Sequence, residues 1–86
     1  MNELELLRKQ IDQIDEEIEK LFEQRMLIAK KIGEYKKEHS LNILDVSREL
    51  EVLEKARKRV KNKELEQYYI ELMKYLMTIS KDYQNK

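Results

Sequence analysis

An apolar stripe that is interrupted once constrains the fold of this 86-residue chain more than any other feature. Apolar residues recur at steps of three and four from Leu4 to Leu21, and again from Ile28 to Tyr35. This spacing puts them on one face of an α-helix, so a single helix is predicted over about residues 2–38. At 1.5 Å per residue the helix is roughly 50 Å long. A compact domain of this size has a radius of gyration of only about 12 Å, so we expect a second chain to cover part of the helix.

Two shorter helices are predicted in the rest of the chain. Residues 39–45 break the period, and Asp45 is suited to cap a second helix over about residues 46–61. A third helix is predicted over about residues 63–85. We expect its inner side to consist of Leu65, Tyr69, Leu72, Met73, Leu76, Ile79 and Tyr83. With no proline and one glycine the chain has few turn signals, so the prediction is an all-α fold in a single domain, residues 1–86.

Charge and composition exclude several classes of function. Charged residues make up 42% of the chain, and the 18 basic residues equal the 18 acidic ones, so no global field favours nucleic acid or a membrane surface. The chain has no cysteine and only one histidine, which gives no disulfide, thiolate or zinc site. No segment reads as a signal peptide or a membrane span. We therefore expect a cytoplasmic protein with no metal and no cofactor.

Arg25 occupies the position at which the apolar stripe is interrupted. A charge in such a seam is costly unless it is paired, and a carboxylate on another helix is the structural alternative to a ligand. Lys36 follows eleven residues later on nearly the same side of the helix, with its Cα atom about 16 Å away. A lysine beside Lys37 is ordinarily solvated surface, but its alignment with Arg25 would let two cations close on one small molecule.

Three further groups of polar residues are candidates for the same site. Ser80 and Gln84 lie one turn apart beside the inner stripe of the third helix, although a frayed helix end would explain them too. The turn DVSRE opens the second helix with Asp45, Arg48 and Glu49. Capping explains Asp45, but it does not explain a cation such as Arg48 at the positive end of a helix.

Arg8 and Gly33 are the remaining anomalies of the first helix. Arg8 lies about 25 Å from Arg25 along the helix and cannot reach the same ligand within one chain. In an antiparallel twofold dimer centred near residue 19 or 20, it would arrive beside residue 30 or so of the other copy. Gly33 costs about 1 kcal/mol in a helix interior, and either close helix packing or room for a ligand could account for it.

Together these residues predict a compact site with up to four cations, one or two carboxylates and two neutral hydrogen-bonding groups. Such a site suits a small dianion that also carries a hydroxyl group. No arrangement of residues resembles a nucleophile with its base, so any reaction would depend on positioning and electrostatics.

In their order and spacing these residues resemble the all-helical class of chorismate mutase. The similarity covers essentially the whole chain. It rests on the opening LLRKQID, the stretch EQRxxxAxxIGxYK, the turn DVSRE and the closing SKDYQ, which matches a Ser-x-x-x-Gln pattern. The resemblance implies an intertwined antiparallel homodimer with three helices per chain and two active sites, each completed by an arginine from the partner that Arg8 matches.

The resemblance also implies roles for the other residues. Arg25 and Ser80 would hold one carboxylate of chorismate, and Lys36 would hold the second together with Arg8 from the partner chain. Lys36 and Gln84 would donate hydrogen bonds to the ether oxygen of the substrate.

In the DVSRE turn, the resemblance places Glu49 and the region of Asp45 against the ring hydroxyl, while Arg48 helps to shape the anionic pocket. The implied activity is the rearrangement of chorismate to prephenate in phenylalanine and tyrosine biosynthesis, without a cofactor. Two alternatives stay open, a related isochorismate pyruvate lyase and a noncatalytic dimerisation or regulatory module. The full Asp-x-x-Arg-Glu turn favours the mutase over the lyase.

Overall fold

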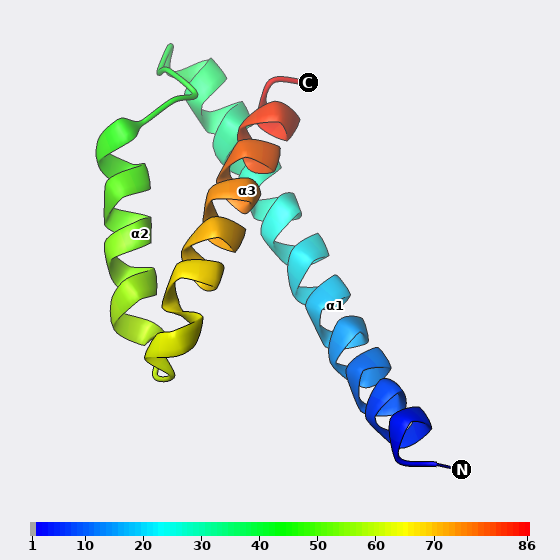
Figure 1. The fold of residues 1–86 in the computed structure, drawn as a ribbon. Helices are drawn as coiled ribbons and strands as arrows, with labels where there is room; N and C mark the ends of the chain where they lie inside the picture. The colour runs from blue at the N-terminus through cyan, green and yellow to red at the C-terminus, as the bar shows by residue number, and fades with distance from the viewer. Residues whose placement is uncertain (1) are drawn as a thin grey trace.

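The computed structural model describes residues 2–86, and over that range the chain is all-helical, without strands. Helix α1 runs over Glu3–Glu38, α2 over Val46–Arg59 and α3 over Glu66–Gln84, with a short 3₁₀ helix, η1, at Lys63–Leu65 (Figure 1). The predicted all-α class with three helices is confirmed.

Short polar side chains begin three of these elements. The side-chain oxygen of Asn2 accepts a hydrogen bond from the backbone N–H of Glu5 at 2.8 Å, and Asp45 accepts one from the N–H of Arg48 at 3.0 Å. Asn62 caps η1 in the same way. Each cap satisfies a backbone donor that the first turn of a helix leaves free, and thereby fixes where the element starts.

The first two helices end differently. Beyond α1, Ser40 adopts a positive φ of 55° and the N–H of Leu41 returns to the carbonyl of Lys36 at 2.8 Å, which closes the last turn. Helix α2 ends at Arg59, two residues earlier than the expected end at 61, because Val60 is extended. Val60 and Lys61 then connect α2 to Asn62, which caps η1.

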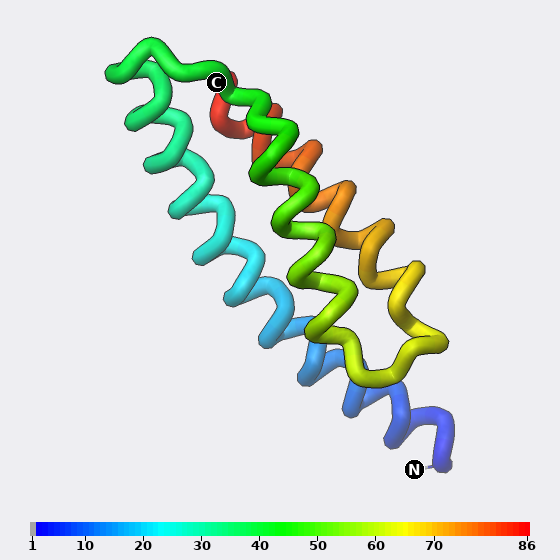
Figure 2. The backbone as a smooth tube through the Cα atoms, turned by 90° about the vertical axis from the view of Figure 1, so that its left-hand side faces the viewer, coloured from blue at the N-terminus to red at the C-terminus, as the bar shows by residue number. Residues whose placement is uncertain are grey.

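Helix α3 lies between the other two and contacts both of them. In the described residues α1 and α2 have no direct backbone contact, so α3 holds the bundle together. Figure 1 shows that the N-terminal half of α1 diverges from α2 and α3, and Figure 2 shows its N-terminal turns projecting past their ends. The molecule measures 56 × 26 × 15 Å, and its radius of gyration of 16.3 Å exceeds the roughly 12 Å of a compact chain of this length.

The single chain has almost no core. Its only buried apolar residues among those described are Ala29, Ala56 and Ile70. The accessible surface is 7586 Å², whereas a compact monomer of 10.6 kDa exposes about 5,500 Å². The isolated fold therefore leaves on the order of 2,000 Å² that a compact protein would bury.

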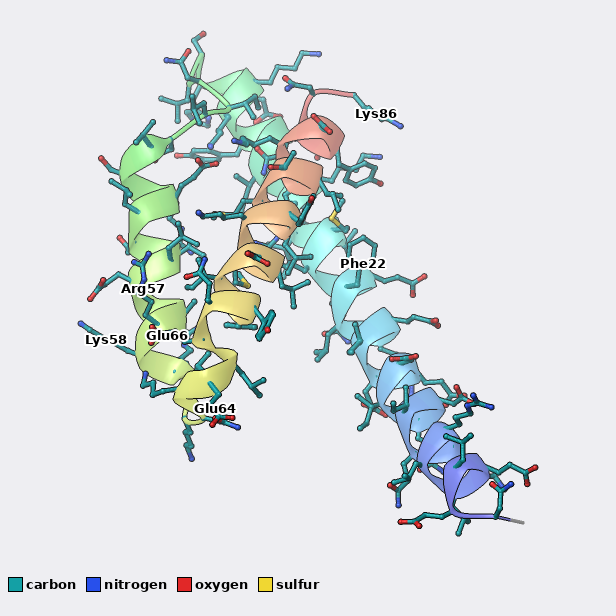
Figure 3. The ribbon with its side chains drawn as sticks, viewed as in Figure 1. Phe22, Arg57, Lys58, Glu64, Glu66 and Lys86 are labelled. Carbon is teal, nitrogen blue, oxygen red and sulfur yellow. The ribbon has the colours of Figure 1, made fainter. Side chains whose placement is uncertain are left out.

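Residues 2–24, here called the arm, contribute to this excess. Every residue of the arm is exposed, and Figure 3 shows its side chains projecting beyond the rest of the molecule. Its large apolar residues are between 38% and 63% exposed: Leu4, Leu6, Leu7, Ile11, Ile14, Ile18, Leu21 and Phe22. A stripe of this size on an isolated helix indicates a surface that another molecule covers.

The charges are divided between the arm and the rest of the chain. Residues 1–24 have eight acidic and three basic residues, a net charge of −5. Residues 25–86 have ten acidic and fifteen basic residues, a net charge of +5. The chain is neutral overall because the negative charge of residues 1–24 and the positive charge of residues 25–86 cancel.

The inner face of α3 differs from the predicted one. Leu65 and Leu72 are 53% and 51% exposed, and Ile79 is 42% exposed, whereas Ile70 is only 1% exposed. The predicted residues Tyr69, Met73, Leu76 and Tyr83 are half-buried as expected. The buried and half-buried positions also include 70, 77, 80 and 84, so Ser80 and Gln84 lie on the inner stripe itself. The expectation for Leu65, Leu72 and Ile79 was wrong because this single chain has nothing that covers the second apolar stripe of α3.

None of the helices described in residues 2–86 is long and apolar enough to cross a membrane.

Candidate active site

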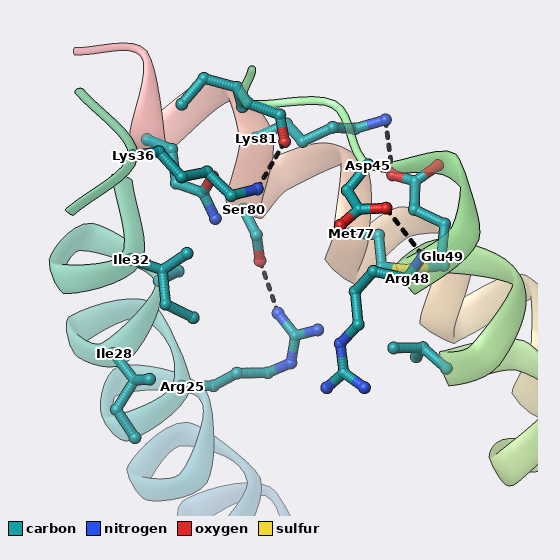
Figure 4. A pocket seen from close by; sticks show the side chains of 14 residues that line it. Arg25, Ile28, Ile32, Lys36, Asp45, Arg48, Glu49, Met77, Ser80 and Lys81 are labelled. Carbon is teal, nitrogen blue, oxygen red and sulfur yellow. Dashed lines mark hydrogen bonds and ion pairs between the residues drawn. The ribbon is translucent and has the colours of Figure 1, made fainter. Parts of the chain in front are cut away.

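A cavity of about 270 Å³ lies where the C-terminal half of α1, the loop before α2, the start of α2 and the end of α3 meet (Figure 4). It brings together residues up to 59 positions apart in the sequence. Of the eight site residues predicted from the sequence, seven line it: Arg25, Lys36, Asp45, Arg48, Glu49, Ser80 and Gln84. The apolar part of its wall includes Ile28, Ile32 and Val52.

Arg25 reaches across from α1 to α3. Its Nη1 donates a hydrogen bond to Oγ of Ser80, whose own hydroxyl donates to the carbonyl of Leu76 at 2.7 Å. Across residues 2–86 no carboxylate lies within ion-pair distance of Arg25. The alternative of an internal carboxylate partner is therefore wrong for this chain, and a half-buried guanidinium faces the cavity with its charge uncompensated.

Lys36 lies at the upper end of the cavity. Its Nζ donates a hydrogen bond to the carbonyl of Ile43 at 2.8 Å, so it ties the loop before α2 to α1. Lys36 is half-buried, whereas its neighbour Lys37 is exposed. The solvated-surface interpretation thus fits Lys37 and does not fit Lys36.

Gln84 is held against α1 by a close approach of two helix backbones. A Cβ atom built on Gly33 would lie 2.9 Å from Cβ and 3.1 Å from Cα of Gln84, so only glycine fits there. Of the two reasons considered for Gly33, the structure supports close packing. Oε1 of Gln84 is buried and has no hydrogen-bond partner in the described residues, an uncommon state for a native polar atom.

The first turn of α2 is fastened by several interactions. Asp45 acts as the cap described above, while Nη1 of Arg48 pairs with Glu51 at 2.6 Å on the outer side of the helix. Lys55 also contacts Glu51, at 3.0 Å. The hydrogen bond and charge of Lys55, followed by those of Arg48, hold the pKa of the Glu51 carboxyl below its ordinary value. Arg48 is thus 59% exposed and partly engaged outside the cavity.

The remaining carboxylate of the cavity belongs to an ion pair between α2 and α3. Oε2 of Glu49 lies 2.8 Å from Nζ of Lys81. Sequence reasoning found Glu49 but missed Lys81, which also lines the cavity. Its position four residues after Met77 and next to Ser80, on the true inner face of α3, is the signal that could have identified it.

Arg8 is the one predicted site residue that the single chain does not bring to the cavity. It is exposed on the arm, seventeen residues before Arg25, or about 26 Å along the helix. Its contribution from a second copy stays a prediction.

The charges that line the cavity favour an anion. Four cations, Arg25, Lys36, Arg48 and Lys81, stand against the carboxylates of Asp45 and Glu49, a net charge of +2. In the described residues no group of three or more His, Asp and Glu side chains is arranged to hold a metal ion. Fold and site together define a small helical protein with a pocket for a compact dianion.

Comparison with known proteins identifies the family. The sequence profile of chorismate mutase type II matches residues 7–85, so the chain belongs to that family. The resemblance inferred from the motifs is confirmed.

Two relatives illustrate the match. A bifunctional chorismate mutase/prephenate dehydratase of Aquifex aeolicus (strain VF5) is 51% identical over 55 residues, which are 64% of this chain and 15% of that protein. The chain thus spans only a small part of the length of this curated relative. The solved structure of a conserved hypothetical protein from Pyrococcus furiosus superposes with a TM-score of 0.81 at 39% identity, covering 98% of this chain and 97% of that one.

Proposed function

We propose that this chain catalyses the rearrangement of chorismate to prephenate. The observation that carries the proposal is the state of Arg25, a half-buried guanidinium whose protein partner is the neutral Ser80, in the same cavity as Lys36. The membership of the family and the chorismate mutase named in the Aquifex relative support the same activity.

Chorismate carries two carboxylates, an ether oxygen and a ring hydroxyl, and the cavity offers a partner for each. We assign one carboxylate to Arg25 and Ser80, which already face each other across the cavity. The second carboxylate falls to Lys36 and to Arg8 of a second copy of the chain. Charge-assisted hydrogen bonds to both ends would fix the compact conformer in which the reacting carbons meet.

Catalysis in this proposal is electrostatic. In the rearrangement a carbon–oxygen bond breaks while a carbon–carbon bond forms within one molecule, and no proton is transferred. Negative charge builds on the ether oxygen, and Lys36 and the amide of Gln84 would donate hydrogen bonds to it. Donors placed in advance bind the charged transition state more strongly than the substrate, which lowers the barrier.

The ring hydroxyl is assigned to the first turn of α2. Glu49 lines the cavity and would accept a hydrogen bond from that hydroxyl, with the region of Asp45 beside it. Arg48 adds positive charge at this edge of the cavity, although it also pairs with Glu51.

We further propose that the functional unit is an intertwined antiparallel homodimer. Three properties of the chain support it: the exposed apolar arm, the excess surface of about 2,000 Å², and the opposite charges of residues 1–24 and 25–86. An arm placed against the partner's body would bury the apolar stripe and bring unlike charges together. It would also carry Arg8 to the partner's cavity.

The test is to incubate purified protein with chorismate and to follow the loss of its ultraviolet absorbance together with the formation of prephenate. Wild-type protein should convert chorismate, and Arg25→Ala should lower the rate by about a hundred to a thousandfold. Arg59→Ala, an exposed arginine outside the cavity, is the matched control and should keep the wild-type rate.

No conversion by folded, dimeric wild-type protein would refute the proposal. A parallel incubation with isochorismate, assayed for pyruvate, would reveal the lyase activity.

A further inference from the structure

Lys81 is the one charged residue of the cavity to which neither the motifs nor the family comparison gives a role. It lies on the inner face of α3, directly after Ser80, and its Nζ is 2.8 Å from Oε2 of Glu49 on α2. The two side chains are 32% and 27% exposed, so the pair lies at the mouth of the cavity rather than on the open surface. Figure 4 shows this contact bridging the two helices.

The pair also forms part of the wall between two hollows. Glu49 and Lys81 line both the candidate active site and a second hollow on the other side, between α2 and α3. A carboxylate in such a wall can turn to either side unless something holds it. The ammonium group of Lys81 restricts the choice, because an ion pair at 2.8 Å favours the side-chain conformation that keeps the two charges together.

The contact occupies only one carboxylate oxygen. Oε2 of Glu49 is paired with Lys81, while Oε1 has no hydrogen-bond partner in residues 2–86 and is not buried. Asp45, the other carboxylate of the cavity, caps α2 through Oδ1 and is exposed, whereas Glu49 is half-buried. Oε1 of Glu49 is therefore the acceptor best placed to receive a hydroxyl hydrogen bond from a bound molecule.

Lys81 also resolves an electrostatic conflict. A dianion is repelled by a bare carboxylate in its pocket, and that repulsion is stronger where solvent screening is weak. When Glu49 is paired with Lys81, its carboxylate can still accept a hydrogen bond, while the ammonium group offsets the negative charge of the carboxylate. Without Lys81 the net charge lining the cavity falls from +2 to +1.

We propose that Lys81 is a positioning residue that holds Glu49 through Oε2 so that Oε1 can accept the ring hydroxyl of the substrate. The pair then makes the pocket selective for a dianion that carries this hydroxyl. This inference rests on the proposed chorismate mutase function and adds to it a specificity device that spans α2 and α3.

The experiment compares chorismate with an analogue in which hydrogen replaces the ring hydroxyl. For wild-type protein we expect kcat/KM and affinity to favour chorismate by about tenfold or more, the usual value of a hydrogen bond to a charged group. Lys81→Met keeps the length of the side chain and removes its charge. It should lower kcat/KM for both dianions because a cation is lost, but for chorismate by about tenfold more than for the analogue, so that the preference is lost.

Three further variants separate positioning from other roles. Lys81→Arg keeps the charge and should retain most of the preference. In a Glu49→Gln background, Lys81→Met should have little additional effect on the preference, because Lys81 acts through the carboxylate. Lys74→Met removes an exposed lysine two turns earlier on α3, outside the active-site cavity, and should match the wild type.

The possible outcomes distinguish this inference from the function on which it rests. Equal losses on both substrates would show that Lys81 acts on the common carboxylates, and no loss on either would show that it acts on nothing in the site; both overturn the inference and leave the activity intact. If wild-type protein binds chorismate without converting it, calorimetric affinities for the two compounds still test Lys81. Wild-type protein that neither binds nor converts chorismate would refute both proposals.

Discussion

Several residues of this chain are unfavourable for the helices that contain them, and in the fold they lie close together. Arg25 interrupts an apolar stripe, Gly33 weakens a helix interior, and Ser80 and Gln84 put polar groups on the inner face of α3. Each would be a defect in an isolated helical bundle. Arg25, Ser80 and Gln84 line one cavity, and Gly33 contacts Gln84, which fits the proposal of a binding site at this place.

Lys36 offers the most direct test at this scale. Lys36→Ala removes a cation from the cavity and the hydrogen bond to the Ile43 carbonyl, and we expect turnover to fall by about a hundred to a thousandfold. Helical circular dichroism should persist. Lys37→Ala is the neighbouring control and should remain active; a wild-type rate for Lys36→Ala would remove this residue from the site.

The assignment of Gln84 as a donor to the ether oxygen predicts how the rate depends on pH. Its amide does not ionise, so we expect little change in rate between about pH 6 and 8. Gln84→Glu would donate to the ether oxygen only when protonated, and its rate should rise as the pH falls. Rate profiles of the two proteins measure this, and a sharp acid optimum in the wild type would contradict the assignment of Gln84.

At the scale of elements, α3 is the helix on which the others depend. It packs on α1 through the close approach of Gly33 and Gln84, and on α2, where the ion pair of Glu49 and Lys81 joins them. The loop before α2 is tied back to α1 by Lys36. We therefore expect a change in the packing of these helices to change the cavity and, with it, the proposed activity.

Gly33→Ala tests this dependence. Alanine favours an isolated helix by about 1 kcal/mol over glycine. Its Cβ would nevertheless lie 2.9 Å and 3.1 Å from atoms of Gln84, one of them backbone, so α1 and α3 must move apart. We expect a lower Tm and a lower rate, whereas Glu34→Ala at the next, exposed position should change neither. A higher Tm for Gly33→Ala would show that the crossing is loose.

The network on α2 predicts how stability depends on pH. Because the Glu51 pKa is held below its ordinary value of 4.5, its stabilising effect is present above that pH and is lost as the pH falls through the lowered value. Glu51→Gln should thus lower Tm slightly near neutral pH, and the effect should disappear at an acid pH at which the carboxyl is protonated. Thermal melts at both pH values measure this, and an equal effect at both would exclude a charge-based cause.

At the scale of the whole molecule, the single chain has a small core and leaves a large apolar surface exposed. It is 56 Å long, buries three apolar residues in its described part, and exposes a stripe of leucine and isoleucine along the arm. We propose a second copy as the partner, because it would supply both a matching stripe and a body of opposite charge. The length of α1 and the isolation of Arg8 then have one explanation.

Mixing two inactive variants tests that explanation. Arg8→Ala and Lys36→Ala chains should each be nearly inactive, since each lacks a group in both sites of the proposed dimer. In a mixed dimer one site combines the intact Lys36 of one chain with the intact Arg8 of the other. Equal, fully exchanged amounts should therefore recover about a quarter of the wild-type activity. Mixed dimers detected by mass with no recovered activity would refute a shared site.

The sequence predicted three helices, their approximate limits and seven of the fourteen residues that line the cavity. Periodicity and capping are local properties, and polar residues on apolar faces stand out without coordinates. It did not determine which face of each helix turns inward, and so it misassigned Leu65, Leu72 and Ile79 and missed Ile70 and Lys81. Those choices depend on which helices meet and how closely.

Three contacts depend on the tertiary structure: the hydrogen bond of Arg25 to Ser80, the close approach of Gly33 to Gln84, and the ion pair of Lys81 with Glu49. These are contacts between segments far apart in the sequence. Their geometry is set by the crossing of α1 and α3 and by the place of α2 beside them, and no local pattern encodes such distances.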